Sequence, residues 1–170
     1  LYNSRDHITR RQILMDVAQA VGETVNYAVP RDTGMDYLDR VETDWAFRIQ
    51  LPIGSRVPFH CTASGKTFLA SLPNKKLQSF LDAIKLSSMT DNTHTTKESL
   101  HDEIKAVRKN GYALDREEFM DDMVAIAVPV TDLQNRYIAA LAFHGPTQRI
   151  NIEDAIAKKD VLKAAAAQIS

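Results

Sequence analysis

One segment of the sequence carries residue types that suit phosphate or carboxylate binding. It runs from His60 to Thr67 and ends in Gly-Lys-Thr, like a phosphate-binding loop. That loop needs a glycine at its first position, where this chain has His60, because the backbone must turn tightly around the phosphates. No parallel strand–helix–strand unit surrounds the segment either. The pattern therefore argues against a nucleotide site.

The same segment is also typical of a loop that enters a helix. Helix N-termini present free N–H groups and a partial positive charge, so they bind carboxylates or phosphates readily. The small residues from Thr62 to Gly65 would let a ligand come close to that backbone. On spacing alone, the segment indicates an anion site and does not specify the ligand.

Cys61 is the only cysteine of the chain and follows His60, so the two could form a nucleophile and its base. Adjacent residues of an extended segment point to opposite faces, and we expect the two side chains not to meet. A single cysteine also excludes an intramolecular disulfide framework and a cysteine-rich zinc site. We interpret Cys61 as a structural or pocket-lining residue without catalytic function.

The acidic residues that follow position 114 are a second candidate cluster: Asp115, Glu117, Glu118, Asp121 and Asp122. Hard-metal loops need a glycine at the sharp turn, and this run has none, so most of these carboxylates are interpreted as solvated charge. Asp115 differs because it directly ends an expected strand, where a carboxylate can overhang a sheet. We also expect Asp115 to lie outside the core.

The five histidines are scattered without the spacing of metal ligands, and we expect neither a metal ion nor a cofactor. His144 alone ends an apolar strand. There it is either a ligand contact or a polar cap of the strand in solvent, and the sequence leaves both interpretations open.

Composition restricts the class of protein that must position these residues. The 170 residues fit one domain, and 44% hydrophobic with 25% charged residues is typical of a globular protein with a core. A formal net charge of -1 argues against a basic nucleic-acid surface. The apolar runs are too short for a membrane span, and no signal peptide opens the chain, so we expect a cytoplasmic protein. Because Leu1 is not Met, we expect a fragment or an excised domain.

Hydrophobic periodicity predicts an α+β fold in which strands are grouped as hairpins. Pro129 lies inside the first strand of the last hairpin, which favours an edge position or a bulge there. In chain order the predicted elements are a helix over 9–21, strands over 24–29, 37–41 and 45–51, helices over 63–72 and 74–84, a helix that starts at a capping box of Thr95 and Glu98 and stops at Gly111, strands over 112–114, 124–130 and 137–143, and a helix over 153–169.

Three segments, in this order, are similar to one known family. Residues 54–70 (GSRVPFHCTASGKTFLA) resemble the signature G-x-x-x-P-x-H-x-x-x-x-G-K-x-x-L-A of the isocitrate-lyase-regulator (IclR) family of bacterial transcription factors. Residues 110–118 (NGYALDREE) resemble its R-x-x-G-Y-x-x-D-x-x-E block, and residues 125–132 with 137–145 resemble its closing hairpin. The resemblance extends from about residue 9 to the end of the chain.

The resemblance implies the C-terminal effector-binding domain of such a regulator, with a GAF-like α+β fold and a mostly antiparallel six-stranded sheet flanked by helices. It further implies a homodimer or tetramer that contacts DNA only through an N-terminal winged helix-turn-helix domain, which is absent from this chain. The effector would be a small organic acid. Its carboxylate would be held by the N–H groups of Ala63 and Ser64, and its polar end by Asp115, while Val57, Ala125, Ala142 and His144 would line the pocket.

Two departures from the family pattern concern the effector. Ala125 and Ala142 occupy positions where several relatives place Cys or Ser, which implies a larger or more apolar effector. Asp122 replaces a frequent glycine. Two other functions remain as hypotheses: a reductase that depends on Cys61, for which the chain has no second thiol, and an oligomerisation module with a vestigial pocket.

Overall fold

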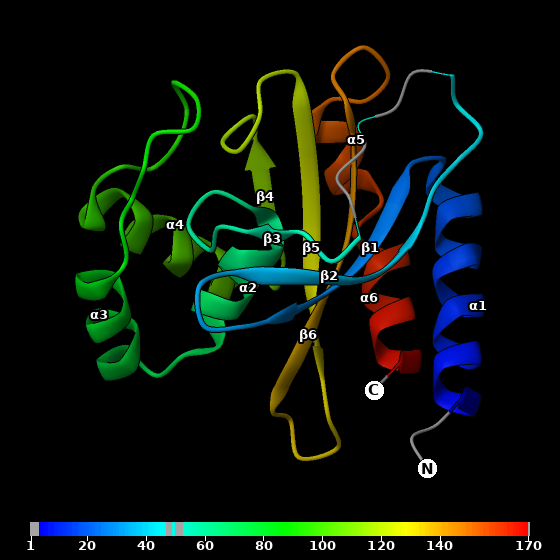
Figure 1. The fold of residues 1–170 in the computed structure, drawn as a ribbon, viewed down its shortest axis with the longest axis horizontal. Coiled ribbons are helices and arrows are strands. Elements are labelled where there is room, and N and C mark those ends of the chain that lie inside the picture. The colour runs from blue at the N-terminus through cyan, green and yellow to red at the C-terminus, as the bar shows by residue number, and fades with distance from the viewer. Residues whose placement is uncertain (1–3, 47–48, 50–52, 170) are drawn as a thin grey trace.

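A six-stranded sheet separates two layers of helices (Figure 1). The computed structural model describes residues 4–46, 49 and 53–169. The elements are α1 (Ser4–Val21), β1 (Thr24–Pro30), β2 (Met35–Val41), β3 (Arg56–Val57), α2 (Ala63–Ser71), α3 (Asn74–Ala83), α4 (Lys97–Asn110), β4 (Ala113–Arg116), β5 (Met123–Thr131), β6 (Tyr137–Pro146), α5 (Ile152–Ala157) and α6 (Lys159–Ile169). None of these helices is long and apolar enough to cross a membrane.

The strand order is β3-β2-β1-β6-β5-β4, and every pairing is antiparallel. The α+β class and the antiparallel six-stranded sheet are therefore confirmed. β4 pairs with β5 only between Val124 and Ala127. Pro129 lies beyond this pairing, where a missing N–H removes no hydrogen bond to β4, and the register shifts soon after it, between Val130 and Thr131. Both features agree with the position predicted for this proline.

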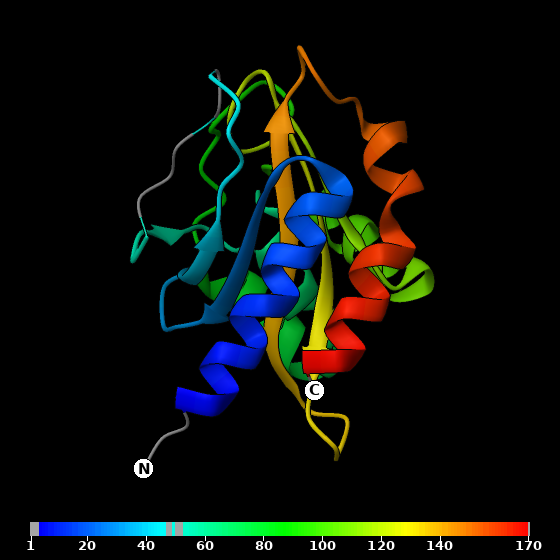
Figure 2. The same cartoon turned by 90° about the vertical axis from the view of Figure 1, so that its right-hand side faces the viewer.

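Different helices pack against the two faces of the sheet. Helices α1, α5 and α6 cover one face and enclose the larger core, which includes Leu14, Phe143 and Leu162 (Figures 1 and 2). Helix α2 lies against the other face, with α3 and α4 beyond it. This second side holds an aromatic cluster in which the rings of Phe59 and Phe68 have centroids 5.1 Å apart. The candidate site lies on the same side, because α2 begins there.

Several predicted elements differ from the structure. Helix α1 begins at Ser4 rather than at residue 9, and β6 continues to Pro146 rather than ending at residue 143. The edge strand is β3, whereas Trp45 and Ala46 are not in a strand, and most of the remaining predicted strand lies outside the described residues. Strand 112–114 is shifted and becomes β4. Helix α4 is capped by Thr96, whose hydroxyl accepts the N–H of Ser99, so the capping residue is one position later than predicted. The C-terminal helix is two helices, because Lys158 leaves the α-helical conformation between α5 and α6. Gly111 ends α4 with a φ of 77°, as predicted.

Candidate functional site

Helix α2 begins next to the sheet. Its first turn is positioned by two hydrogen bonds of Thr62 and by a close contact between Gly65 and the preceding loop. The hydroxyl of Thr62 accepts the N–H of Gly65 at 3.0 Å and donates to the carbonyl of Pro58 at 2.7 Å. A Cβ at position 65 would lie 2.4 Å from the Cα of Phe59, so only glycine permits this close approach. Ala63 and Ser64 are the first two helical residues, whose N–H groups have no intrahelical acceptor.

A small cavity lies between this helix start and the sheet. The space open to the centre of a water-sized sphere is about 10 Å³, roughly enough for one water molecule. The side chains therefore nearly close the cavity. Five strands (β1, β2, β4, β5 and β6), the start of α2 and the connection between β4 and β5 supply the residues that line it. These residues are Asn26, Tyr37, Thr62, Ala63, Ser64, Asp115, Phe119, Met123, Ala125, Ala142, Phe143 and His144.

Six of the seven residues expected at the site thus lie around one cavity: Ala63, Ser64, Asp115, Ala125, Ala142 and His144. Val57 is not among them. It is buried in β3, which pairs with β2 beside Met35, and it belongs to the neighbouring apolar cluster with Phe59. The structure therefore does not place Val57 at the cavity wall.

Asp115 is buried, with 1% of its surface exposed, which contradicts the expectation that it lies outside the core. The reason is that the chain folds back after β4, and the N–H of Glu118 donates to Asp115 Oδ1 at 2.7 Å. Burial raises the pKa of the Asp115 carboxyl to about 7, and the charge of Glu118 acts in the same direction. Near neutral pH this carboxyl is therefore present in both forms, one that donates a hydrogen bond and one that only accepts.

His144 is buried too, so the interpretation of this residue as a polar cap in solvent is wrong. Its Nδ1 accepts the side-chain amide of Asn26 at 2.9 Å, and its Nε2–H donates to the carbonyl of Ile49 at 3.3 Å. Burial lowers the pKa of His144 to about 4, which keeps the ring neutral at physiological pH. The cavity therefore has a neutral, fixed imidazole on its β6 side.

Lys66, which resembles a phosphate-binding lysine in the sequence, is completely buried and bound to carboxylates. Its Nζ lies 2.8 and 3.0 Å from the two carboxylate oxygens of Glu118 and 3.7 Å from Glu103. His60 Nε2 in turn donates to the carbonyl of Ser87 at 2.8 Å. The Gly-Lys-Thr segment therefore anchors α2 to the residues around it. Because the ammonium group of Lys66 is already paired with carboxylates, it is not available to bind a phosphate.

Cys61 has no exposed surface and does not line the cavity. Burial raises the pKa of its thiol to about 12, so the thiolate needed for nucleophilic chemistry is scarce at neutral pH. Its interpretation as a structural residue fits this environment.

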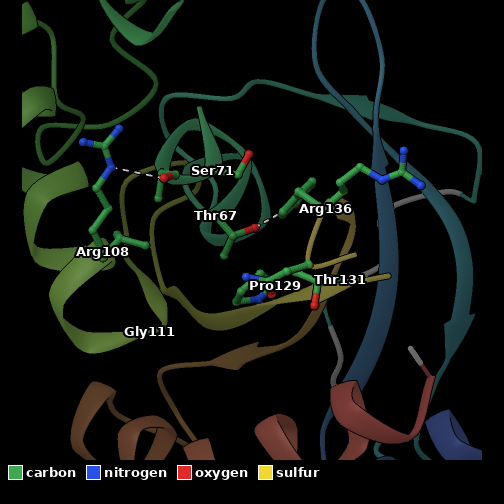
Figure 3. Close-up of a pocket in the computed structure, with 11 residues that line it drawn as sticks. Thr67, Ser71, Arg108, Gly111, Pro129, Thr131 and Arg136 are labelled. Atoms are coloured by element: carbon green, nitrogen blue, oxygen red, sulfur yellow. Dashed lines mark hydrogen bonds between the residues drawn. The ribbon is translucent and has the colours of Figure 1, made fainter. Parts of the chain in front are cut away.

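A larger cavity of about 580 Å³ lies at the other end of α2, between α4 and the β5–β6 hairpin (Figure 3). It contains no residue expected at the site. Its two arginines bind the protein itself: Arg108 Nη2 donates to the carbonyl of Leu72 at 2.7 Å, and Arg136 pairs with Asp132 at 2.8 Å. Thr67 donates to the carbonyl of Ser64, which links this cavity to the start of α2.

Five lining residues were not predicted from the sequence: Asn26, Tyr37, Phe119, Met123 and Phe143. Asn26 did carry a signal, because it is the only amide in the otherwise apolar and β-branched run TVNYAV. A polar side chain in a buried strand needs a partner, and here the partners are His144 and Arg40. The other four have side-chain types that are equally common in cores.

Comparison with known proteins identifies the architecture that carries this cavity. Residues 4–170 match the family described as "Bacterial transcriptional regulator IclR C-terminal". The chain belongs to this family. The resemblance seen in the sequence is therefore confirmed. Among curated IclR-type relatives, the probable transcriptional regulator SauR of Cupriavidus necator is 38% identical over 144 residues, which are 85% of this chain and 57% of that protein. The chain thus spans little more than half the length of this relative.

Solved structures of IclR proteins have the same fold. The crystal structure of Thermotoga maritima IclR superposes with a TM-score of 0.90 at 30% identity, over 97% of this chain and 67% of that one. The inducer-binding domain of the transcription factor PobR from Acinetobacter, a double mutant in complex with 3-hydroxybenzoic acid, gives a TM-score of 0.86 at 25% identity. In that comparison 94% of each chain is covered.

Proposed function

We propose that this chain is the effector-binding domain of a bacterial transcriptional regulator and that a small organic acid binds in the cavity beneath α2. One observation carries the proposal: Ala63 and Ser64, whose N–H groups have no acceptor within α2, line the same cavity as Asp115. The complex of the PobR domain with an aromatic hydroxy acid supports the same class of ligand.

The chemistry of each side of the cavity defines the ligand. The start of α2 supplies N–H donors and a favourable potential for a carboxylate. Asp115 accepts from a hydroxyl or another donor when it is ionised. Ala125 and Ala142 form an apolar wall without side-chain hydrogen bonds, while His144 offers a neutral ring. A carboxylic acid with an apolar body and a donor at its far end matches this arrangement.

Binding requires the cavity to open, because its present volume holds about one water molecule. Met123 is an unbranched lining residue that changes rotamer at low cost, and Phe119 lies in the connection after β4. The ligand would select the open form from the ensemble and stabilise it. In the full-length regulator this change would reach the operator through an N-terminal winged helix-turn-helix domain.

The same proposal describes a sensor without catalytic activity, which acts in the cytoplasm as a homodimer or tetramer. The buried thiol of Cys61 supports this assignment over a reductase. The nearly closed cavity, in contrast, favours the second candidate function, an oligomerisation module whose pocket no longer binds a ligand. Both candidates are compatible with the fold, so ligand binding must decide between them.

A thermal-shift screen of hydroxy, keto and aromatic acids, including 3-hydroxybenzoate, tests the proposal. A ligand at one hundred times its Kd adds ~2.7 kcal/mol to the free energy of unfolding. For a domain of this length, that raises Tm by roughly 5–10 °C. Ser64→Trp should abolish the shift by filling the cavity, whereas Ser71→Trp at the exposed end of α2 should keep it. Absence of any stabilising acid would favour the oligomerisation module.

A further inference from the structure

Arg40 is a buried cation without a counter-ion. Only two cationic side chains, Lys66 and Arg40, are classed as buried among the described residues. Lys66 has the carboxylate of Glu118, but Arg40 makes no ion pair within the described part of the chain. Its Nε donates to Asn26 Oδ1 at 2.7 Å, and its guanidinium lies 5.0 Å from the centroid of the Tyr37 ring. Its Nη2 is buried and has no hydrogen-bond partner.

Burial of the unpaired Arg40 charge lowers the stability of the folded state. Burial lowers the pKa of Arg40, but an arginine stays protonated at neutral pH, so the charge persists. Buried charges in folded proteins are almost always paired, because an unpaired one loses its hydration without compensation. The acidic side chain whose charge raises the pKa of Arg40 is Glu42, which is exposed. A cost of this kind is typical of a position at which a ligand supplies the missing partner.

The sheet register places Arg40 on the face that carries the cavity. Arg40 pairs with Asn26 on β1, and Asn26 pairs with Ala142 on β6, so these three side chains form one row across the sheet. Asn26 and Ala142 both line the cavity. Tyr37, which lies beneath the guanidinium, lines it as well. Arg40 itself does not line the cavity, but it contacts two residues that do, Asn26 and Tyr37, and it lies on the same face of the sheet.

We propose that Arg40 binds a second anionic group of the effector, so that the effector is a diacid. This inference rests on the proposed function, in which the first carboxylate binds the N–H groups of Ala63 and Ser64. An opened cavity that reaches past Asn26 and Tyr37 would then meet two separate positive centres, the start of α2 and the Arg40 guanidinium. A monoacid satisfies one of them and leaves the other without a partner. A second carboxylate, or a phosphonate in its place, satisfies both.

Variants of Arg40 can distinguish binding of the ligand from a purely structural function of this side chain. Arg40 also positions Asn26, which in turn holds His144. A variant that keeps the hydrogen bond to Asn26 and removes the charge separates the two functions, and Arg40→Gln is such a variant. Arg40→Lys retains the charge but loses the planar fork. Arg56→Gln is the matched control. Arg56 is exposed on β3, so this substitution removes the same charge from the surface of the protein.

The experiment compares diacids with their half-amides, which have the same size and one negative charge fewer. Titration calorimetry and thermal shift on this chain would use succinate against succinamate, malonate against malonamate, and isophthalate against 3-carbamoylbenzoate. The parent should prefer at least one diacid about 10- to 100-fold, the range of a charge-assisted hydrogen bond. Arg40→Gln should lose that preference, Arg40→Lys should keep part of it, and Arg56→Gln should keep it fully.

The outcomes separate this inference from the proposed function. If the parent binds a half-amide or another monoacid as tightly as every diacid, the domain is a sensor and the inference about Arg40 is wrong. The same holds if Arg40→Gln retains the preference for a diacid. If neither these acids nor any acid of the thermal-shift screen binds the parent, both the proposed function and the inference are overturned. Should Arg40→Gln fail to fold, an undiminished preference for the diacid over its half-amide in Arg40→Lys would contradict the inference.

Discussion

Asp115 and His144 are two buried titratable residues whose pKa values are shifted by the same physical cause in opposite senses. They belong to one row across the sheet, in which Asp115 pairs with Ala125 and Ala125 pairs with His144. Burial disfavours the charged form of each, which raises the pKa of the acid to about 7 and lowers that of the base to about 4. The cavity therefore reaches its least charged state in mildly acidic solution.

Asp115→Asn should make the free energy of unfolding less dependent on pH. The carboxyl of Asp115 binds its proton more tightly in the folded state than at its ordinary pKa of 3.8, so its contribution falls as pH rises from about 4 to about 7. At 1.36 kcal/mol per pKa unit, the loss amounts to roughly a few kcal/mol. Asn keeps the acceptor for the N–H of Glu118 and does not ionise. Urea unfolding of both proteins at pH 5 and pH 8 measures the difference.

The exposed Asp121 provides the control for this measurement. Asp121→Asn should show the same change between pH 5 and pH 8 as the parent. If Asp115→Asn loses as much stability as the parent over this interval, the raised pKa assigned to Asp115 is wrong.

Cys61 should react slowly with a thiol reagent in the folded domain. Its side chain has no exposed surface, and a pKa of about 12 leaves almost no thiolate at pH 7. Absorbance after addition of a chromogenic disulfide should therefore rise only as the protein unfolds, and the rate should increase by orders of magnitude in urea. Rapid labelling under native conditions would revive the hypothesis of a reactive thiol.

At the scale of elements, the position of α2 decides whether the site exists. This helix presents the N–H groups of Ala63 and Ser64, and it is fixed by contacts on both sides of its first turn. Gly65 allows the loop at Phe59 to pass close beneath it, and Lys66 binds Glu118 in the connection between β4 and β5. The Glu118 N–H in turn binds Asp115. The two ends of the ligand site are therefore linked through one buried ion pair.

Gly65→Ala should destabilise the domain even though alanine favours helices. Helix propensity alone would add about 1 kcal/mol to the free energy of unfolding. The new Cβ, however, would lie 2.4 Å from backbone atoms of Phe59, which cannot move without displacing the loop. We expect a net loss of about 2 kcal/mol or more, the range for overpacking. Ser71→Ala on the same helix should stay within about 1 kcal/mol of the parent in urea unfolding. A stabilised Gly65→Ala variant would contradict the close approach.

Lys66→Met should cost about 3–5 kcal/mol, because it leaves the buried carboxylate of Glu118 without its main partner. The double variant Lys66→Met/Glu118→Gln should recover most of this loss, since no unpaired charge remains. The exposed pair of Lys97 and Asp82, at a similar distance of 2.7 Å, is the control and should contribute less than about 1 kcal/mol. A double-mutant cycle in urea measures both coupling energies. Equal values would show that burial does not strengthen the Lys66 pair.

The sequence was sufficient for most elements, because they have local signals: periodicity in α1, the αL glycine that ends α4, and a polar turn between β5 and β6. It did not predict the two-residue strand β3 or the break between α5 and α6. It was insufficient for burial on β2. A register shift between Tyr27 and Ala28 places Tyr37 opposite Ala28 and Arg40 opposite Asn26, so that these two residues, three apart in β2, are buried on the same face of the sheet. Alternation along the strand cannot reveal this, because the register shift depends on the pairing partner. Tyr37 and Arg40 were missed for this reason.

At the scale of the whole molecule, β2 connects the cavity side to the N-terminal helix. Arg40 lies on the face with the cavity, whereas the neighbouring Asp39 accepts from Arg11 of α1 at 2.7 Å on the other face. Arg10 of α1 also lies 3.7 Å from Asp39. A ligand that moves Arg40 would therefore act on a strand that is bonded directly to α1, the element that precedes all others in this chain.

The outer surface of α1 is where we expect the domain to self-associate. The apolar stripe of α1 with Ile13 and Val17 would be one candidate and the Ala-rich terminal helix another, but Ile13 and Val17 are buried in the core of their own chain, as are Leu162 and Ala165 of α6. The exposed apolar side chains of α1 are Ile8 and Met15, at 65% and 47% exposure. They are seven residues apart and so lie on one face of the helix.

Sedimentation equilibrium at ~100 µM, a concentration suited to weak dimers, should give a mass above that of one chain. The double variant Ile8→Asp/Met15→Asp should shift the distribution towards the monomer, because it places two charges on the expected contact. Leu133→Asp is the control, since Leu133 is 91% exposed and lies in the turn between β5 and β6 rather than on α1. It should leave the mass unchanged. A monomeric parent would contradict self-association of this domain, and a monomeric Leu133→Asp variant would move the contact to the hairpin.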